Sequence, residues 1–482
     1  MTTQPENWVR YIRQVAEFDR LQLLELIASV SSQQMDTSLS LSEERNQVQN
    51  FTPFQPFSLA AIARDVVLNG PKRGGRRPRL EDLERLCNRY LNLYDPIFST
   101  RRTSGSFDRY TVRIAYEQFA FQLSPLSELA RSWVLYSETP EMMHEPRLDS
   151  ASWAGVLGCD LDDFIRTNFI WYIQAMRNNG WVDLEDLPTN EIIAQAGLRL
   201  DTDVKTVGEM LLTASFTELR NHPQNSKVIK GLEKYRFNPF EAKPYLRIAG
   251  NYLAPSLHLA AQRTWTRNLY YDRVREPGFT DALGPVFETY IGRQLRLLSK
   301  EITCTIYDKV IFDRGNGEEE SIDWFVVFQE LVLLVEVKST RLTEESRLGL
   351  DRLQPDIGRT LGIAFKQLET TAQMMREGAI EFSHLPVDRP LLGLAVTLEP
   401  YWILGDQDLL PIQPHGIVAH PVSCGELEDM VSAGLAGPIT SNLMKLVSDS
   451  RVGGRRFNSA LSGLPKVDNP ILDNAFVHLL GK

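Results

Sequence analysis

Three charged residues stand at the ends of two strongly apolar runs in the second half of the chain. The stretch from 321 to 340 reads SIDWFVVFQELVLLVEVKST. Asp323 precedes the first apolar run, Glu336 and Lys338 lie at the end of the second, and a polar Gln-Glu pair separates the runs. Two apolar runs joined by a short polar connection predict a β-hairpin.

The length of the connection decides which residues of this hairpin face each other. With a two-residue turn at 329 and 330, residues whose numbers sum to 659 are paired, so Asp323 lies opposite Glu336. The two-residue period of a strand then places Lys338 on the same face of the sheet. A four-residue turn keeps this arrangement, whereas an odd-length turn breaks it.

Two carboxylates that face each other destabilise a sheet unless a cation lies between them. Hard oxygen ligands around such a gap predict a Mg²⁺ or Mn²⁺ site. A bound divalent ion polarises a phosphoryl oxygen and lowers the pKa of bound water, and a nearby ammonium group positions that water. This combination suits phosphodiester hydrolysis. The alternative is a hairpin whose charged side chains only reach solvent at the edge of a sheet.

An Asp followed by Glu-x-Lys on the next strand resembles the PD-(D/E)XK, or restriction-endonuclease-like, nuclease superfamily, over residues from about 280 to about 430. A proline often precedes the first carboxylate in that superfamily, and Ile322 stands there in this chain. The resemblance implies that Asp323, Glu336 and the main-chain carbonyl of Val337 bind the metal. It also implies that Lys338 orients or activates water.

The resemblance adds one residue from each of two expected helices. Glu288, in a helix expected over 280–300 with Pro285 in its first turn, corresponds in placement to a glutamate that many members aim at the metal. A solvent-exposed helix glutamate accounts for it equally well. Gln367 lies near the start of a helix expected over 360–377, where some families place a glutamine with a tyrosine four residues later. Thr371 occupies that later position, so the motif is incomplete.

The elements around the hairpin predict an α/β restriction-endonuclease-like core, in which helices flank a mixed central sheet. The β-rich run 302–312 is the expected first strand, and 313–320 is a polar loop before the hairpin. Residues 389–404 supply a strand beside the Glu-x-Lys strand, 412–419 supply a later one, and Ser423 caps the helix that follows.

Three segments describe the expected domain organisation. Residues 1–238 form a large, mainly α-helical N-terminal region, because their apolar residues repeat at helical spacing. This region is a candidate for binding a substrate or partner. Residues 239–435 form the nuclease domain, including a helical lead-in over 245–275. Residues 436–482 form a helical tail.

Composition limits the protein's class. The chain has 482 residues and a formal net charge of −10, which excludes a protein that coats nucleic acid over its whole surface but leaves room for a local basic groove. Four distant cysteines show no metal-ligand spacing and are expected to be reduced thiols. No signal peptide or membrane-spanning run is recognised, so we expect a cytoplasmic protein with no membrane partner.

Three basic segments are candidates for contact with phosphates. They are 69–78, the arginine- and aromatic-rich stretch 263–275, and the cluster at 451–456. The alternatives are solvated loops for the first and last, and core packing with arginines extending outward for the second.

Together these features predict a Mg²⁺- or Mn²⁺-dependent nuclease, most simply a DNA endonuclease, with a role in bacterial defence against foreign DNA. The alternatives are a catalytically silent nucleic-acid-binding or scaffold protein and an RNA-cleaving nuclease. No GxxxxGK[ST] loop occurs, so any translocation requires a separate ATPase or sensor subunit. Since one active centre cuts one strand, double-strand cleavage favours a homo-oligomer.

Overall fold

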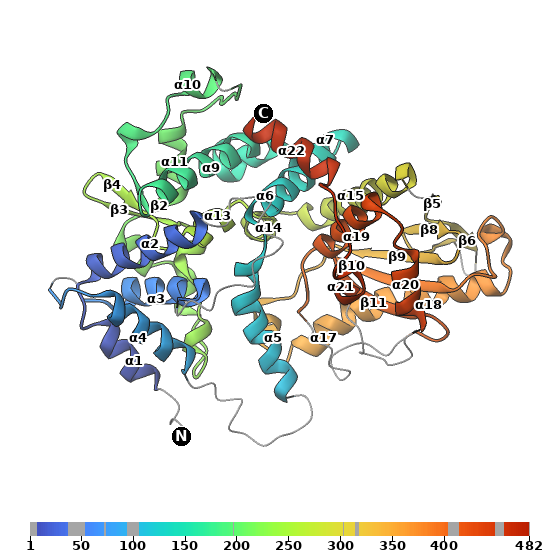
Figure 1. The fold of residues 1–482 in the computed structure, drawn as a ribbon, viewed down its shortest axis with the longest axis horizontal. Helices are drawn as coiled ribbons and strands as arrows, with labels where there is room; N and C mark the ends of the chain where they lie inside the picture. The colour runs from blue at the N-terminus through green and yellow to red at the C-terminus, as the bar shows by residue number, and fades with distance from the viewer. Residues whose placement is uncertain are drawn as a thin grey trace.

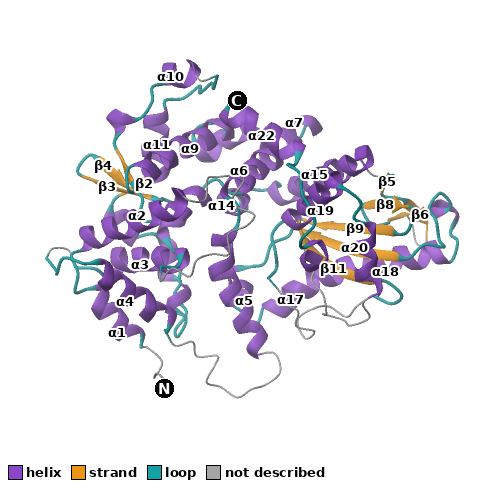
Figure 2. Ribbon diagram, in the orientation of Figure 1, coloured by secondary structure: helices purple, strands orange, loops and turns teal. Residues whose placement is uncertain are grey.

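The structure is a computed structural model that describes residues 7–36, 54–71, 74–93, 106–195, 197–301, 303–313, 318–402, 414–448 and 457–481. Helices from the first half of the chain occupy one side of the molecule, and a five-stranded sheet with its covering helices occupies the other (Figures 1 and 2). Across these described ranges, no helix has both the length and the apolar character needed to cross a membrane.

The first half of the chain is mainly helical, as its apolar periodicity predicts. Its helices are α1 (Trp8–Val15), α2 (Arg20–Asp36), α3 (Pro56–Asn69), α4 (Leu80–Leu91), α5 (Ser106–Gln118), α6 (Pro125–Trp133), α7 (Thr139–Met143), α8 (Ala154–Leu157), α9 (Leu161–Arg177), α10 (Asn190–Gln195), α11 (Val204–Leu212), α12 (Phe216–Arg220), α13 (Leu257–Gln262) and α14 (Thr266–Arg273). Short helical turns connect several of them.

A small sheet interrupts this helical half and corrects the helical lead-in expected from residue 245. Strands β3 (Tyr245–Ile248) and β4 (Asn251–Leu253) form a hairpin around Ala249 and Gly250, which both have positive φ. A two-residue turn of this kind matches the twist of the strands and outweighs local helix propensity.

The small sheet has the order β1-β4-β3-β2. Its outer strands β1 (Trp181–Val182) and β2 (Thr213–Ala214) come from before residue 238, and β3 and β4 come from after it. Backbone pairing therefore crosses the point where the first domain boundary was predicted, and that boundary stays a prediction.

The larger sheet has the order β11-β10-β9-β8-β5. Its strands are β5 (Cys304–Asp308), β8 (Trp324–Phe328), β9 (Val332–Lys338), β10 (Leu391–Thr397) and β11 (Val418–Ser423). The first three form an antiparallel meander, while β10 runs parallel to both β9 and β11. The sheet is therefore mixed, and β10 pairs with the Glu-x-Lys strand as expected.

Helices cover both faces of this sheet. Helix α15 (Phe279–Glu301) and α19 (Cys424–Ala436) pack on one face, and α18 (Ile363–Arg376) packs on the other. Two short helices, α16 (Glu344–Arg347) and α17 (Leu353–Ile357), lie between β9 and α18. The final helices are α20 (Thr440–Ser448), α21 (Phe457–Leu461) and α22 (Pro470–Leu480), and α22 returns to pack on α6 and α9.

Several expectations about element boundaries are wrong. The run 302–312 is divided between β5 and β6 (Ile311–Asp313), and the expected loop contains β7 (Glu318–Glu320), which pairs with β6. Pro285 is the seventh residue of α15, which starts at Phe279, so it lies inside the helix and not in its first turn. Strand β11 starts at Val418, and residues 412–413 lie outside the described ranges. Ser423 does cap α19, with a capping box to Glu426.

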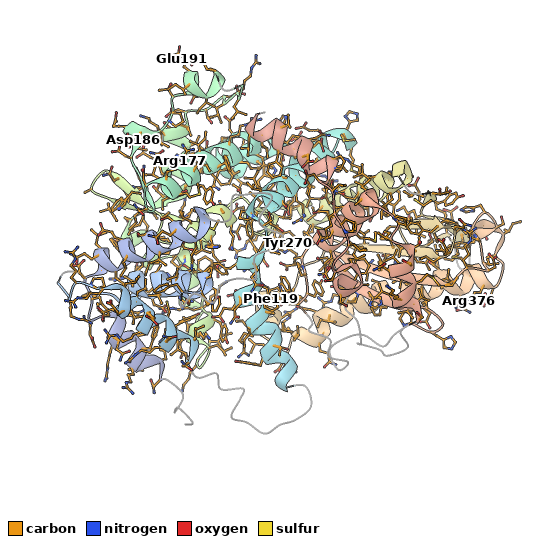
Figure 3. The ribbon with its side chains drawn as sticks, viewed as in Figure 1. Phe119, Arg177, Asp186, Glu191, Tyr270 and Arg376 are labelled. Carbon is orange, nitrogen blue, oxygen red and sulfur yellow. The ribbon has the colours of Figure 1, made fainter. Side chains whose placement is uncertain are left out.

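Polar and aromatic contacts connect the two halves of the molecule. Tyr270 and Phe119 lie between them, whereas Arg177 and Arg376 lie toward opposite sides (Figure 3). The ring of Phe119 packs edge-on against Trp402, with centroids 5.0 Å apart. The turn that follows α5 thereby packs against the segment that follows β10.

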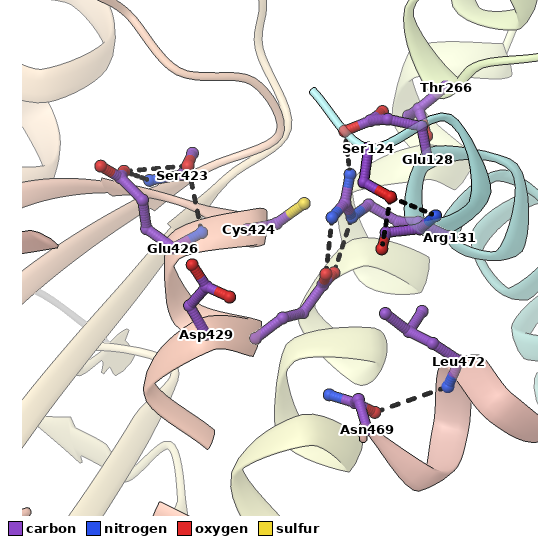
Figure 4. A network of polar contacts seen from close by, with 12 residues as sticks. Ser124, Glu128, Arg131, Thr266, Ser423, Cys424, Glu426, Asp429, Asn469 and Leu472 are labelled. Atoms are coloured by element: carbon purple, nitrogen blue, oxygen red, sulfur yellow. Dashed lines mark hydrogen bonds and ion pairs between the residues drawn. The ribbon is translucent and has the colours of Figure 1, made fainter. Parts of the chain in front are cut away.

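A buried ion network joins helices α6 and α19. The guanidinium of Arg131 donates to both carboxylate oxygens of Glu428, at 2.7 and 2.6 Å, and also to Glu128 (Figure 4). The hydroxyl of Tyr290 on α15 donates to Glu428 at 2.5 Å. Each carboxylate oxygen of Glu428 thus has a partner.

The structure tests only part of the predictions for the three basic segments. Arg263 and Arg273 are buried and paired with carboxylates, at 2.8 Å from Asp272 and 2.6 Å from Glu276, and so do not extend outward. The cluster at 451–456, and residues 72–73 of the first basic segment, lie outside the described ranges. The cysteines are unpaired: three are buried and Cys304 is half-buried.

Candidate active site

The hairpin of β8 and β9 has the register that its sequence predicts. Trp324 pairs with Val335 and Val327 pairs with Val332, so paired numbers sum to 659. The N–H of Phe328 donates to the carbonyl of Leu331 at 3.0 Å, which closes a two-residue turn. Apolar residues make up most of both strands, because both faces of the sheet are covered.

Asp323 lies just before β8, at the edge where β9 ends. Its Oδ2 accepts a hydrogen bond from the main-chain N–H of Val337 at 2.7 Å. The N–H and C=O of a strand residue point toward the same neighbouring strand. The Val337 carbonyl therefore faces the Asp323 side as well.

The residues before Asp323 are held by their own hydrogen bonds. Ser321 exchanges two bonds with Val310, at 2.8 and 2.9 Å. The N–H of Ile322 donates to the Thr371 hydroxyl on α18 at 3.3 Å. Thr371, which breaks the expected glutamine and tyrosine motif, thus contributes to the position of the Asp323 segment.

Glu336 and Lys338 lie one pleat apart on β9, on the face covered by α18. Glu336 is only 2% exposed. The Lys338 ammonium donates to Glu336 Oε1 at 2.5 Å. The second oxygen, Oε2, is buried and has no hydrogen-bond partner among the described residues.

Gln367 contacts the lysine of the site. The Lys338 ammonium donates to Gln367 Oε1 at 2.9 Å, which ties the end of β9 to α18. Neighbouring Lys366 is exposed. In this arrangement Gln367 orients Lys338.

Glu288 lies on α15, the helix that covers the opposite face of the sheet. The indole N–H of Trp324 donates to the main-chain carbonyl of Glu288 at 3.1 Å. A Cβ on Gly292 would come within 2.1 Å of the Trp324 ring, so only glycine allows α15 to approach so closely. Since Trp324 follows Asp323, this contact brings Glu288 near the site from its edge.

The pKa of each of the three carboxyl groups, Asp323, Glu336 and Glu288, is raised. Burial, followed by repulsion from Glu336, raises the pKa of Asp323. Burial also raises the pKa of Glu336, although the Lys338 ammonium opposes the shift. Burial, followed by repulsion from Asp323, raises the pKa of Glu288 to about 7. Three acids that resist ionisation together form an environment that favours a cation.

The donor set fits a hard divalent ion. Asp323 and Glu336 supply carboxylate oxygens, one of them buried without a protein partner, and Val337 supplies a carbonyl. Among the described residues, no group of three or more His, Cys, Asp and Glu side chains is arranged to hold a metal. A site with two carboxylates suits Mg²⁺, which keeps several waters and binds substrate phosphates.

Sequence reasoning missed one cation near this site. Lys309 lies between β5 and β6, forms an exposed ion pair with Glu320 at 2.8 Å, and acts electrostatically on the carboxyl groups of Asp323 and Glu288. A single lysine in a β-rich run carries no signal of this role. The register of the β6–β7 ribbon brings it there.

Comparison with known proteins adds little to this geometry. No family model and no curated protein matches the chain. A solved structure that does match is the small subunit of the heterodimeric restriction endonuclease R.BspD6I, at 12% identity. The match covers 36% of this chain and 84% of that subunit, with a TM-score of 0.19. So low a TM-score supports no conclusion about family or activity.

Proposed function

We propose that this protein is a metal-dependent nuclease that hydrolyses phosphodiester bonds, and that DNA is its substrate. The observation that carries the proposal is that buried Glu336 has an oxygen without a partner among the described residues. The hairpin register, continued by one residue, puts Glu336 opposite Asp323, and Lys338 lies on the same face. A buried carboxylate oxygen without a partner is costly, and a bound cation relieves that cost.

Asp323, Glu336 and the Val337 carbonyl would hold Mg²⁺ or Mn²⁺ directly, and Glu288 would reach the ion only through water. The ion would supply Lewis-acid polarisation of a phosphoryl oxygen and a water of lowered pKa. Lys338, held between Glu336 and Gln367, presents an ammonium group that orients water and neutralises charge developing on the phosphate.

The order of elements supports the same proposal. Helix α15, the β5-β8-β9 meander, crossover helix α18 and parallel strand β10 follow one another along the chain. This order is compatible with a restriction-endonuclease-like core, which mostly acts on DNA. Defence against foreign DNA is a role that such a nuclease would serve, and it forms part of the proposal by analogy of fold alone.

The test is cleavage of circular double-stranded DNA, circular single-stranded DNA and a matched RNA, with Mg²⁺, Mn²⁺ or EDTA. Wild type is compared with Asp323→Asn and Lys338→Met, which retain the size of the side chain. Glu330→Gln is the matched control, because it changes an exposed carboxylate in the turn of the same hairpin.

We expect cleavage of DNA that requires the metal, is lost in both site variants and persists in Glu330→Gln. Cleavage of RNA alone would replace DNA as the substrate. Nucleic-acid binding without cleavage by any folded form, under any of these metals, would contradict the nuclease proposal and favour a binding or scaffold protein.

A further inference from the structure

A second charged region lies in a cavity of about 660 Å³ between the helical half and α16. Its walls come from α3, α4, α5, the segment 222–242, α13, α14 and α16. Nine arginine and lysine side chains line it, against four aspartate and glutamate side chains. Since the whole chain carries a net charge of −10, this local positive excess favours an anionic ligand.

Some of these cations are already neutralised. Arg263 pairs with Asp272 at 2.8 Å, Lys234 lies 3.7 Å from Glu117, and Arg267 lies 3.9 Å from Glu241. Arg64 and Arg236 both pair with the buried Asp65, at 2.8 Å each. The remaining excess is spread over several walls, and Arg275 and Lys227 are exposed on the lining. A ligand that enters the cavity therefore meets positive charge from more than one element.

Four arginines of the lining each have a buried donor without a partner among the described residues. The Nε atoms of Arg236, Arg263, Arg267 and Arg347 are buried and have no hydrogen-bond partner within the described ranges. Arg263 is only 6% exposed. A guanidinium group has several N–H donors, and a phosphate accepts several charge-assisted hydrogen bonds from such groups.

Aromatic rings stand beside these donors. Tyr271 is 38% exposed, and the Arg347 guanidinium lies 5.0 Å from its ring centroid. Phe237 stacks on His222, with centroids 4.8 Å apart and planes 25° apart. Both Tyr271 and Phe237 line the cavity, so flat surfaces for a nucleobase lie close to donors for a phosphate.

The geometry points to a nucleotide-binding site that is distinct from the hairpin carboxylates. Its size falls within the range of small-molecule sites and is too small to enclose a duplex. The ligand is a free nucleotide or the phosphorylated terminal nucleotide of a single strand, which present the same chemistry. This site does not rest on the proposed nuclease activity, because binding here requires no hydrolysis.

Isothermal titration calorimetry on the full chain tests the site. The probes are AMP, ATP, adenosine, inorganic phosphate, and one short DNA strand with and without a 5′-phosphate, all in EDTA. The variants are Arg347→Gln and Arg275→Gln. Arg177→Gln is the control, because it removes an exposed arginine that lies away from the cavity (Figure 3).

We expect AMP or ATP to bind, adenosine to bind far more weakly, and affinity to fall about tenfold or more in Arg347→Gln and less in Arg275→Gln. The Arg177→Gln control keeps wild-type affinity. Binding of the 5′-phosphorylated strand without binding of AMP or ATP would identify a strand end as the ligand.

Two results would overturn the site. One is the absence of binding by every phosphorylated probe, and the other is equal affinity in wild type and both lining variants. If Arg347→Gln fails to fold, as judged by circular dichroism, exposed Arg275→Gln decides the outcome. Asp323→Asn is titrated in parallel, and retained binding there separates this inference from the nuclease proposal.

Discussion

Two buried carboxylates of this protein, Glu428 and Glu336, have opposite surroundings. Glu428 is 4% exposed, and both of its oxygens accept hydrogen bonds, from Arg131 and Tyr290. Glu336 is 2% exposed, shares one lysine, and has an oxygen without a partner in the described part of the chain. The first joins two halves of the molecule, whereas the second faces another carboxylate.

The difference distinguishes a buried charge that is balanced within the protein from one that is not. A satisfied buried ion pair specifies how elements pack, and its own charges balance. A buried carboxylate pair with one lysine has an excess of negative charge, so it destabilises the metal-free protein. Under the proposed function, a bound cation would offset this excess of negative charge.

Glu336→Gln should produce the largest effect of the comparison. We expect cleavage of DNA to fall by about 10³-fold, because the substitution removes a charge that acts directly at the reacting phosphate. Initial rates on circular DNA measure the loss, and urea unfolding should show no loss of stability. A variant with wild-type rates would show that Glu336 has no part in the chemistry.

Glu428→Ala should affect stability and leave the chemistry intact. We expect the free energy of unfolding to fall by about 3 kcal/mol, since Arg131 stays buried with a single remaining partner, Glu128. Urea denaturation measures the change, and Glu191→Ala on exposed α10 is the control. A change within about 0.5 kcal/mol of wild type would remove the contrast between the two glutamates.

Asp323→Asn should stabilise the metal-free protein at high pH. The folded-state pKa of Asp323 lies above its ordinary value, so the folded protein binds more protons than the unfolded chain, and wild-type stability falls as pH rises from about 4 to about 7. Asn lacks this penalty and keeps an oxygen for the Val337 N–H. We expect a gain of about 1–2 kcal/mol at pH 8 in EDTA and none below pH 4.

Thermal unfolding across pH measures that gain. An Asp323→Asn variant that is less stable than wild type at pH 8 would mean that the carboxylate is satisfied within the protein. In that case Asp323 would resemble Glu428 rather than a metal ligand.

Gln367→Leu should have the smallest effect. We expect about a tenfold loss of cleavage rate with binding of DNA unchanged, because the variant releases one of the two partners that hold the Lys338 ammonium. A pH–rate profile distinguishes this role from simple packing, since a freed lysine changes the pH dependence. An unchanged pH–rate profile and cleavage rate would mean that Gln367 contacts Lys338 without affecting cleavage.

Local patterns in the sequence were enough to predict the hairpin, its register and the proximity of Asp323, Glu336 and Lys338. A two-residue turn and a strand period of two leave few alternatives once both strands are apolar. The same reasoning predicted the pairing of β10 with β9 and the cap at Ser423. The β3–β4 hairpin was also readable, from its turn at Ala249 and Gly250, and was missed.

Tertiary structure alone decided what surrounds those residues. Gln367 reaches Lys338 because α18 packs on β9. Glu288 approaches from the other face of the sheet because Gly292 allows α15 to pack closely against Trp324. The sequence cannot show that both oxygens of Glu428 have hydrogen-bond partners while one oxygen of Glu336 has none among the described residues. Burial and hydrogen bonding depend on elements far apart in the chain, and no local pattern encodes their meeting.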